Sequence, residues 1–410
     1  MTKENSTENT DSGTNHTAIP WIVFLFSIGI VLISFISVVF PALILSSDTV
    51  KIPGIDPVTP DPFEAGVWSG GVIVASVIIF GLALLHHKKK INPLSRLFEK
   101  VFSFEISNKV SLVIMALLII IYISVSAGEL SVEENLGDYA GVKKRLGTWS
   151  IDTITSFEPH VRYFLLSSSM VLFGSYKVIP FLASIALLIT TYLITKTITQ
   201  KRFAGIVATV ILLQSSVFLT YDTTVSYTNF WVLFYLISLY MAYKFWPLSP
   251  AAYLLSITSK ALTAAFLPMS IYFILRSNIS KKQKIITAGI TTGIILAGGI
   301  ASITGISTTQ GTEEEFDAKE FQMGFTSFAY QLRSDGLVML FMIPLVVGLF
   351  IVSKNGMKHG ESMMIFISGM LLIAPILTGF TNQTNQPYRF VPLVVFFAMG
   401  VGVLLSKRQT

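Results

Sequence analysis

The chain has no cysteine in its 410 residues and few charged side chains. Without cysteine there is no disulfide framework, no thiolate nucleophile and no zinc site built on cysteine ligands. Charged residues make up 13% of the chain, whereas a soluble domain carries about 25%. Because a surface that faces water needs charge, this deficit excludes a single soluble globule, and the 52% hydrophobic content agrees.

Long apolar runs take the place of the missing charge. A helix needs roughly 20 apolar residues to cross the hydrocarbon core of a bilayer. Segment 246–276 is apolar but interrupted by Pro247, Pro250, Lys260 and Pro268, and we interpret it as two short spans that meet near Lys260. The alternative is one kinked span. The full set predicts twelve crossings: 19–45, 68–86, 109–128, 177–196, 203–220, 228–245, two in 246–276, 283–305, 336–353, 362–380 and 389–405.

The distribution of charge favours twelve crossings over eleven. With a cytoplasmic N-terminus, most of the 29 basic residues fall in cytoplasmic loops and most of the 23 acidic residues fall on the other side. Twelve crossings therefore satisfy the positive-inside rule, whereas eleven would place the basic segment 276–284 outside. We expect an all-α, multi-pass protein of the cell (plasma) membrane with N- and C-termini in the cytoplasm.

The pattern divides the chain into three parts. Residues 1–18 are polar and lack the basic start of a signal peptide, which predicts a disordered cytoplasmic tail. Residues 19–108 hold two transmembrane helices and a basic cytoplasmic linker, and residues 109–410 hold the main bundle. The first long external loop contains the apolar segment 161–174, which is too short to span and predicts a short interfacial helix.

Acidic residues follow span 109–128 closely. Glu133, Glu134 and Asp138 lie in this loop, and Tyr139 follows at the start of a stretch that predicts a short helix. A carboxylate at the mouth of a membrane cavity is placed to accept a proton from a hydroxyl nucleophile. The alternative is that these are ordinary solvated loop acids.

Three basic residues lie at the edges of apolar segments. Arg389 begins an apolar helix, where an arginine can hold a phosphate in a bidentate manner. Arg162 leads into another apolar helix, where a basic residue at the membrane interface suits a phosphate-carrying lipid. Lys260 lies within an apolar stretch, where a lysine is costly and needs a partner or a cavity. The alternative for all three is anchoring at the membrane interface.

The order of these features resembles the GT-C superfamily of membrane glycosyltransferases over about residues 109 to 410. The closer likeness is to the branch of bacterial aminoarabinose transferases and protein O-mannosyltransferase-like enzymes. Two positions depart from the pattern of that branch: Asn229 stands where a second acid is usual, and His160 stands where a second proline is common. The resemblance rests on EENLGDYAGVKKRLG (133–147), FEPHVRYFLLSSSMVLFG (157–174), PFLASIALLITTYLITKTITQKR (180–202), AGIVATVILLQSSVFLTY (204–221), SITSKALTAAFLP (256–268) and YRFVP (388–392).

The resemblance implies an inverting glycosyltransferase with a GT-C-like bundle. A sugar would move from a polyprenyl-phosphate donor (dolichyl or undecaprenyl type) to a protein, glycan or lipid acceptor on the outer face. Partners are then this donor and membrane lipid, with no nucleic acid. Some members use a divalent metal and others do not, the sequence does not decide between them, and we assign no metal ligand. The implied catalytic acids are Glu133 or Glu134 and then Asp138, the implied phosphate-binding residues are Arg389, Lys260 and Arg162, and the implied cavity residues are Tyr139, Glu158, His160, Asn229 and Tyr388.

Two other classes of function stay open at this point. Twelve crossings are common among transporters and lipid flippases, which usually show internal repeats and charges at the membrane midplane. The sequence shows neither a repeat nor such charges, because its acids gather in the external loops. The third hypothesis is a non-catalytic GT-C-like membrane scaffold, in agreement with the asparagine at position 229.

Overall fold

The computed structural model describes residues 18–43, 61, 63–88, 92–150, 159–303, 315–381 and 386–406. The predicted N-terminal tail lies outside these residues except for Ala18, which begins the first helix. All regular structure within the described residues is helical: α1 (Ala18–Val39), η1 (Pro41–Leu43), α2 (Ser69–His87), α3 (Asn92–Ser103), α4 (Asn108–Ser126), η3 (Ala127–Ser131), α5 (Tyr139–Thr148), α6 (His160–Phe173), α7 (Val178–Thr199), α8 (Arg202–Leu213), α9 (Ser216–Tyr221), α10 (Phe230–Lys244), α11 (Leu248–Ser259), η5 (Ala261–Phe266), α12 (Leu267–Arg276), α13 (Lys281–Ile303), α14 (Ala318–Gly324), α15 (Thr326–Gln331), α16 (Gly336–Lys354), α17 (Lys358–Thr381), η6 (Pro387–Phe390) and α18 (Val391–Leu404).

Seven helices of the described chain are long and apolar enough to cross a membrane, which confirms the prediction of an all-α membrane protein. Three further apolar helices are shorter: Arg202–Leu213, Phe230–Lys244 and Ala261–Arg276. The seven long ones are Ala18–Val39, Ser69–His86, Asn108–Ser131, Val178–Thr199, Gly336–Lys354, Lys358–Phe380 and Pro387–Leu404.

The outer helices expose apolar side chains that lipid tails can cover. Ile22 of α1, Val77 of α2 and Leu112 of α4 are each more than half exposed. In water such a surface would cost about 25 cal/mol per Å² of apolar area. By contrast, α18 is almost fully buried, with Phe396 and Phe397 in the core.

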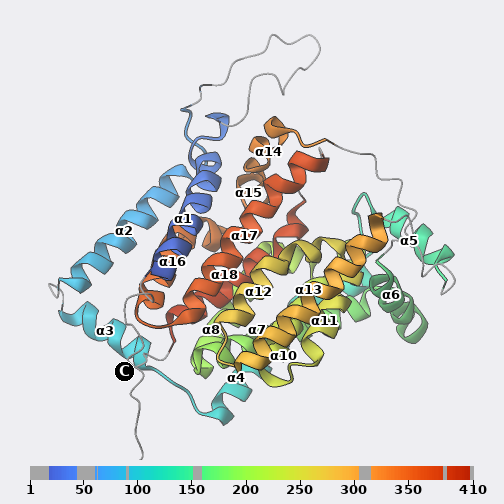
Figure 1. Cartoon of the computed structure of the whole chain (residues 1–410), viewed down its shortest axis with the longest axis horizontal. Coiled ribbons are helices and arrows are strands. Elements are labelled where there is room, and N and C mark those ends of the chain that lie inside the picture. The colour runs from blue at the N-terminus through green and yellow to red at the C-terminus, as the bar shows by residue number, and fades with distance from the viewer. Residues whose placement is uncertain are drawn as a thin grey trace, which may run out of the picture.

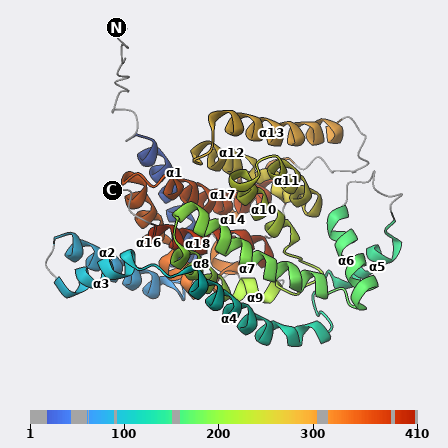
Figure 2. The same ribbon diagram turned by 90° about the horizontal axis from the view of Figure 1, so that it is seen from below.

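The helices form one bundle in which the N-terminal helix packs against the C-terminal ones. Helix α1 contacts α15, α16 and α17, although more than 280 positions separate these segments. Phe24 stacks on Phe350 with ring centroids 4.2 Å apart, and the Ser27 and Ser368 hydroxyls lie 3.2 Å apart. Figures 1 and 2 both place α2 and α3 at one side of the bundle and α5 and α6 at the opposite side.

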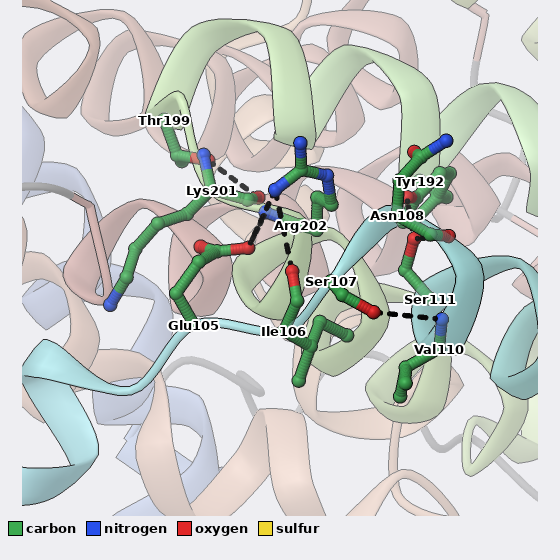
Figure 3. Close-up of polar contacts among 10 residues, drawn as sticks. All are labelled: Glu105, Ile106, Ser107, Asn108, Val110, Ser111, Tyr192, Thr199, Lys201 and Arg202. Atoms are coloured by element: carbon green, nitrogen blue, oxygen red, sulfur yellow. Dashed lines mark hydrogen bonds and ion pairs between the residues drawn. The ribbon is translucent and has the colours of Figure 1, made fainter.

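Polar contacts between distant segments gather at the two ends of the bundle. At one end, here called the Arg202 end, Arg202 and Lys201 at the start of α8 contact the linker before α4 (Figure 3). The Arg202 amide donates to Glu105 Oε1 over 3.1 Å, and Lys201 Nζ donates to the Phe102 carbonyl over 2.6 Å. These bonds hold the linker between α3 and α4 against the main bundle.

The opposite end is here called the Tyr388 end. The indole of Trp68, just before α2, donates to the Arg333 carbonyl over 3.0 Å. The Asp335 carboxylate, just before α16, accepts the Ser216 amide over 2.7 Å. This end therefore joins helix ends from the whole length of the chain, and it carries the candidate site.

Candidate functional site

A cavity of about 520 Å³ opens at the Tyr388 end. Its walls come from α5, α6, the loop before α10, the break between α11 and η5, and η6. One carboxylate, three cations and four large aromatic rings line it: Asp138, Arg145, Arg162, Lys260, Tyr163, Tyr227, Trp231 and Tyr388. The structure thus brings together four residues that the sequence predicts for the site, namely Asp138, Arg162, Lys260 and Tyr388.

The key side chains of this cavity lie where one helix ends or the next begins. Asp138 precedes α5, and its carboxylate does not cap that helix but accepts a 2.6 Å hydrogen bond from the Tyr227 hydroxyl. Lys260 is extended, with φ −162° and ψ 116°, between α11 and η5. Pro387 begins η6 and so positions Tyr388. Helix ends, rather than helix faces, therefore build the site.

Two tyrosine rings of the cavity stack on each other, and one of them contacts the lysine. Tyr227 and Tyr388 lie with ring centroids 4.1 Å apart and planes 12° from parallel. Lys260 Nζ lies 3.7 Å from the Tyr388 ring centroid and 5.1 Å from that of Trp231. Both contacts are cation–π interactions, which stabilise a desolvated ammonium group.

Arg162 and Glu134 fix the loop before α10 from opposite sides. The Arg162 guanidinium donates to the carbonyls of Val225 (3.0 Å) and Ser226. The Glu134 carboxylate accepts the amides of the same two residues, over 2.7 Å and 3.1 Å. Glu134 thereby orders the cavity wall, and it is not among the residues that line the cavity.

Two buried polar atoms at this wall have no hydrogen-bond partner in the described chain. They are Nε of Arg162 and Oγ of Ser226, and both residues line the cavity. An unpaired buried polar group costs about 1–3 kcal/mol. A ligand with acceptor oxygens in the cavity would satisfy the Arg162 donor and remove this cost.

The charges at the cavity favour an anion. Burial lowers the pKa of Lys260 from its ordinary value, and the positive charges of Arg389 and Arg162 lower it further. Burial likewise lowers the pKa of Arg162. A bound phosphate would reverse part of this effect, because a nearby anion favours the charged form of a base.

Other residues that the sequence predicts for the site lie around the cavity or away from it. Glu133 pairs with Lys143 over 3.2 Å, and its side chain is 74% exposed. Tyr139 begins α5 beneath the ammonium of the same lysine, 5.1 Å from the ring centroid. The Trp149 indole donates to His160 Nδ1 over 3.3 Å. None of these residues lines the cavity.

Of three further predicted residues, two do not line the cavity and one lies outside the described residues. Arg389 follows Tyr388 and acts on Lys260 through its charge without lining the cavity. Asn229 is buried before α10, where Nδ2 donates to the Tyr221 carbonyl over 3.2 Å. Glu158 lies outside the described residues.

The sequence-based prediction named only Asn229 in loop 222–229 and missed Asp222, Ser226 and Tyr227. This loop supplies Tyr227 and Ser226 to the cavity, and the buried Asp222 anchors it. Asp222 Oδ2 accepts the Ser126 hydroxyl over 2.6 Å, and burial raises the pKa of this carboxyl to about 6. The available signal was the run of hydroxyl-bearing residues between two apolar spans.

No family model matches the chain, and neither a curated protein nor a solved structure matches it. Within the described residues, no group of three histidine or acidic side chains could hold a metal ion.

Proposed function

We propose that the protein is an inverting glycosyltransferase that uses a polyprenyl-phosphate-linked sugar at the Tyr388 end. One observation carries the proposal: a single cavity holds a tyrosine-anchored carboxylate, Asp138, together with Arg145, Arg162 and Lys260. A reaction that releases a phosphate from a sugar while a hydroxyl loses its proton needs both kinds of group.

Some residues of the cavity bind the phosphate of the sugar donor, and one residue acts as the base. Lys260, Arg162 and Arg145 bind the donor phosphate, whose oxygens pair with the unsatisfied Nε of Arg162. Asp138 takes the proton of the acceptor hydroxyl, and Tyr227 holds that carboxylate in position. The acceptor oxygen bonds to the anomeric carbon from the face opposite the phosphate. The bond from that carbon to the phosphate oxygen breaks, and its electron pair leaves with the polyprenyl phosphate.

The cations act mainly on the leaving group. Negative charge grows on the phosphate as the glycosidic bond breaks, and fixed cations stabilise it without reorganisation. Lys260 is half-buried between the Tyr388 and Trp231 rings, and this partial shielding from water strengthens the effect, because an ion pair is stronger where water is excluded.

We also propose twelve crossings and an outward-facing Tyr388 end. The seven long helices give seven crossings. The other five are α8 together with α9, α10 alone, α11 alone, η5 together with α12, and α13 alone. Alternation then places both termini in the cytoplasm and the cavity outside. The excess of basic residues in the intervening loops of the Arg202 end supports this orientation.

The test is release of polyprenyl phosphate by the purified full-length protein in lipid nanodiscs. Undecaprenyl- and dolichyl-phosphate sugars are supplied with protein, glycan and lipid acceptors. A transferase releases polyprenyl phosphate and labels one acceptor class. A scaffold that is shown to be folded releases none. A flippase moves the donor between leaflets of a liposome without cleaving it.

A further inference from the structure

A second hollow lies at the Tyr388 end, where α1 ends and α2 begins. This cavity of about 650 Å³ is mostly apolar and is bounded by Val38, Val67, Trp68, Ala329 and Tyr330. The cavity lies at the ends of two membrane-spanning helices. This depth corresponds to the membrane–water boundary, where Trp and Tyr are enriched.

A smaller cavity of about 230 Å³ adjoins the apolar one. The two share Tyr330, Arg333 and Ser334. Hydroxyl and amide side chains line the smaller cavity together with Val217 and Pro387, and the buried Oγ of Ser216 at its wall has no hydrogen-bond partner in the described chain. We call the two cavities together the Arg333 groove.

The Tyr221 ring lies between the Arg333 groove and the proposed donor cavity. Tyr221 lines the groove, and its ring centroid lies 5.8 Å from that of Tyr227 and 6.0 Å from that of Tyr388. The latter two rings line the cavity that holds Asp138. A molecule in the groove therefore contacts Tyr221, which packs against the two tyrosines beside the proposed base.

We propose that the Arg333 groove binds the acceptor, and that this acceptor is a membrane lipid with an anionic headgroup. The apolar cavity takes the lipid tail, Arg333 pairs with the anionic group, and the hydroxyl to be glycosylated points towards Tyr221 and Asp138. The acceptor role rests on the proposed transferase function, whereas binding of the lipid does not.

The order of chemistry along the groove selects this occupant. The groove offers an apolar cavity, then an exposed arginine stacked 4.9 Å over the Tyr330 ring, then a cavity with hydroxyl and amide groups on its walls. These match the tail, the charge and the hydroxyls of an anionic amphiphile. A soluble glycan would leave the apolar cavity without a partner. An extended peptide often binds by pairing with the exposed edge of a β-sheet. The groove offers helix ends and side chains instead of such an edge.

The binding test uses native mass spectrometry of the full-length protein released from nanodiscs. The probes are phosphatidylglycerol and phosphatidylcholine with identical acyl chains. We expect wild type to retain phosphatidylglycerol about tenfold more than phosphatidylcholine, as for a charge-assisted contact. Arg333→Gln should abolish this preference, and Ala329→Trp should reduce retention of both lipids. Leu32→Trp, on the exposed face of α1, is the matched control and should behave as wild type.

Equal retention of the two lipids by wild type would overturn the proposal, as would a preference that survives Arg333→Gln. Displacement of the lipid by maltoheptaose or by a soluble peptide would overturn it as well. Because this assay needs no donor, its failure is separate from failure of the transferase. Release of polyprenyl phosphate by a protein without lipid preference would overturn the proposed lipid site and leave the proposed transferase function standing. A lipid preference in a protein that never releases polyprenyl phosphate would overturn the transferase function and the acceptor role, and would leave lipid binding standing.

Discussion

The Tyr227 hydroxyl donates a 2.6 Å hydrogen bond to Oδ2 of Asp138, joining the start of α5 to the loop before α10. Hydrogen bonds to ionised acceptors are short and roughly twice as strong as neutral ones. A carboxylate offers two oxygens as acceptors. The bond to Tyr227 therefore fixes the side chain and leaves Oδ1 for a substrate proton, which makes Asp138 the proposed base.

Removing the lysine of the donor cavity should weaken donor binding. Lys260→Gln deletes an ammonium held at the Tyr388 and Trp231 rings. Loss of a charge-assisted contact to phosphate costs about 1.5–3 kcal/mol, so the inhibition constant of farnesyl phosphate in the transferase assay should rise by about tenfold or more. Lys144→Gln, on the exposed surface of α5, is the control and should leave this constant unchanged. Equal constants for both variants would remove Lys260 from the phosphate site.

The carboxyl of Asp222 should make stability depend on pH. Burial raises its pKa to about 6 from an ordinary 3.8, so between these pH values the folded protein binds more protons than the unfolded one. Stability therefore falls as pH rises from about 4 to about 6, by about 3 kcal/mol, and this contribution is flat above that range. Asp222→Asn should lose this part of the slope, as measured by thermal unfolding in detergent from pH 4 to pH 7. Identical slopes for the two proteins would contradict the assignment.

Two ion pairs should differ strongly in their effect on stability. Glu361 is 1% exposed and accepts Arg276 Nη2 over 2.6 Å, whereas Glu133 is 74% exposed in its pair with Lys143. Glu361→Gln leaves the partly buried Arg276 guanidinium without its counter-ion and should lower the free energy of unfolding by about 3 kcal/mol. Glu133→Gln should cause no measurable change, because solvent screens exposed pairs. Denaturant titration of both variants checks this, and equal effects would contradict the burial of Glu361.

Two glycines of helices should respond in opposite ways to alanine. A Cβ on Gly205 of α8 would lie 2.7 Å from the Tyr192 ring and 2.8 Å from its carbonyl on α7. Gly205→Ala should therefore force α7 and α8 apart and cost about 1–3 kcal/mol. A Cβ on Gly289 of α13 meets nothing within 4 Å, so Gly289→Ala should be neutral or stabilising by up to about 1 kcal/mol. The melting temperatures of the two variants are compared with that of wild type. A Gly205→Ala protein that melts at the wild-type temperature would contradict the close contact of α7 and α8.

The sequence predicted the membrane class well because hydrophobic length and charge placement are local properties. The run from Ile19 to Leu45 needs no partner to be recognised as a span, and α1 covers most of it. The break at Lys260 was equally readable from its prolines and its charge, and the chain is extended there. The apolar segment 161–174 corresponds to α6.

The site was less predictable because it depends on contacts between distant segments. Glu133 and Glu134 are adjacent in sequence, yet one faces solvent with Lys143 and the other holds the amides of Val225 and Ser226, 91 and 92 positions away. Their local pattern cannot distinguish these environments. Tyr227 carried no motif at all, and its role follows only from its contact with Asp138.

The central claim is tested most directly by the rate of polyprenyl phosphate release from the preferred donor with Asp138→Asn. The variant keeps the shape of the side chain and an acceptor for Tyr227 but cannot take a proton. General-base catalysis contributes about 10²–10⁴-fold, so release should fall by that factor while Glu133→Gln retains the wild-type rate. Release by Asp138→Asn at the wild-type rate, or collapse with Glu133→Gln instead, would contradict the assignment of Asp138 as the base.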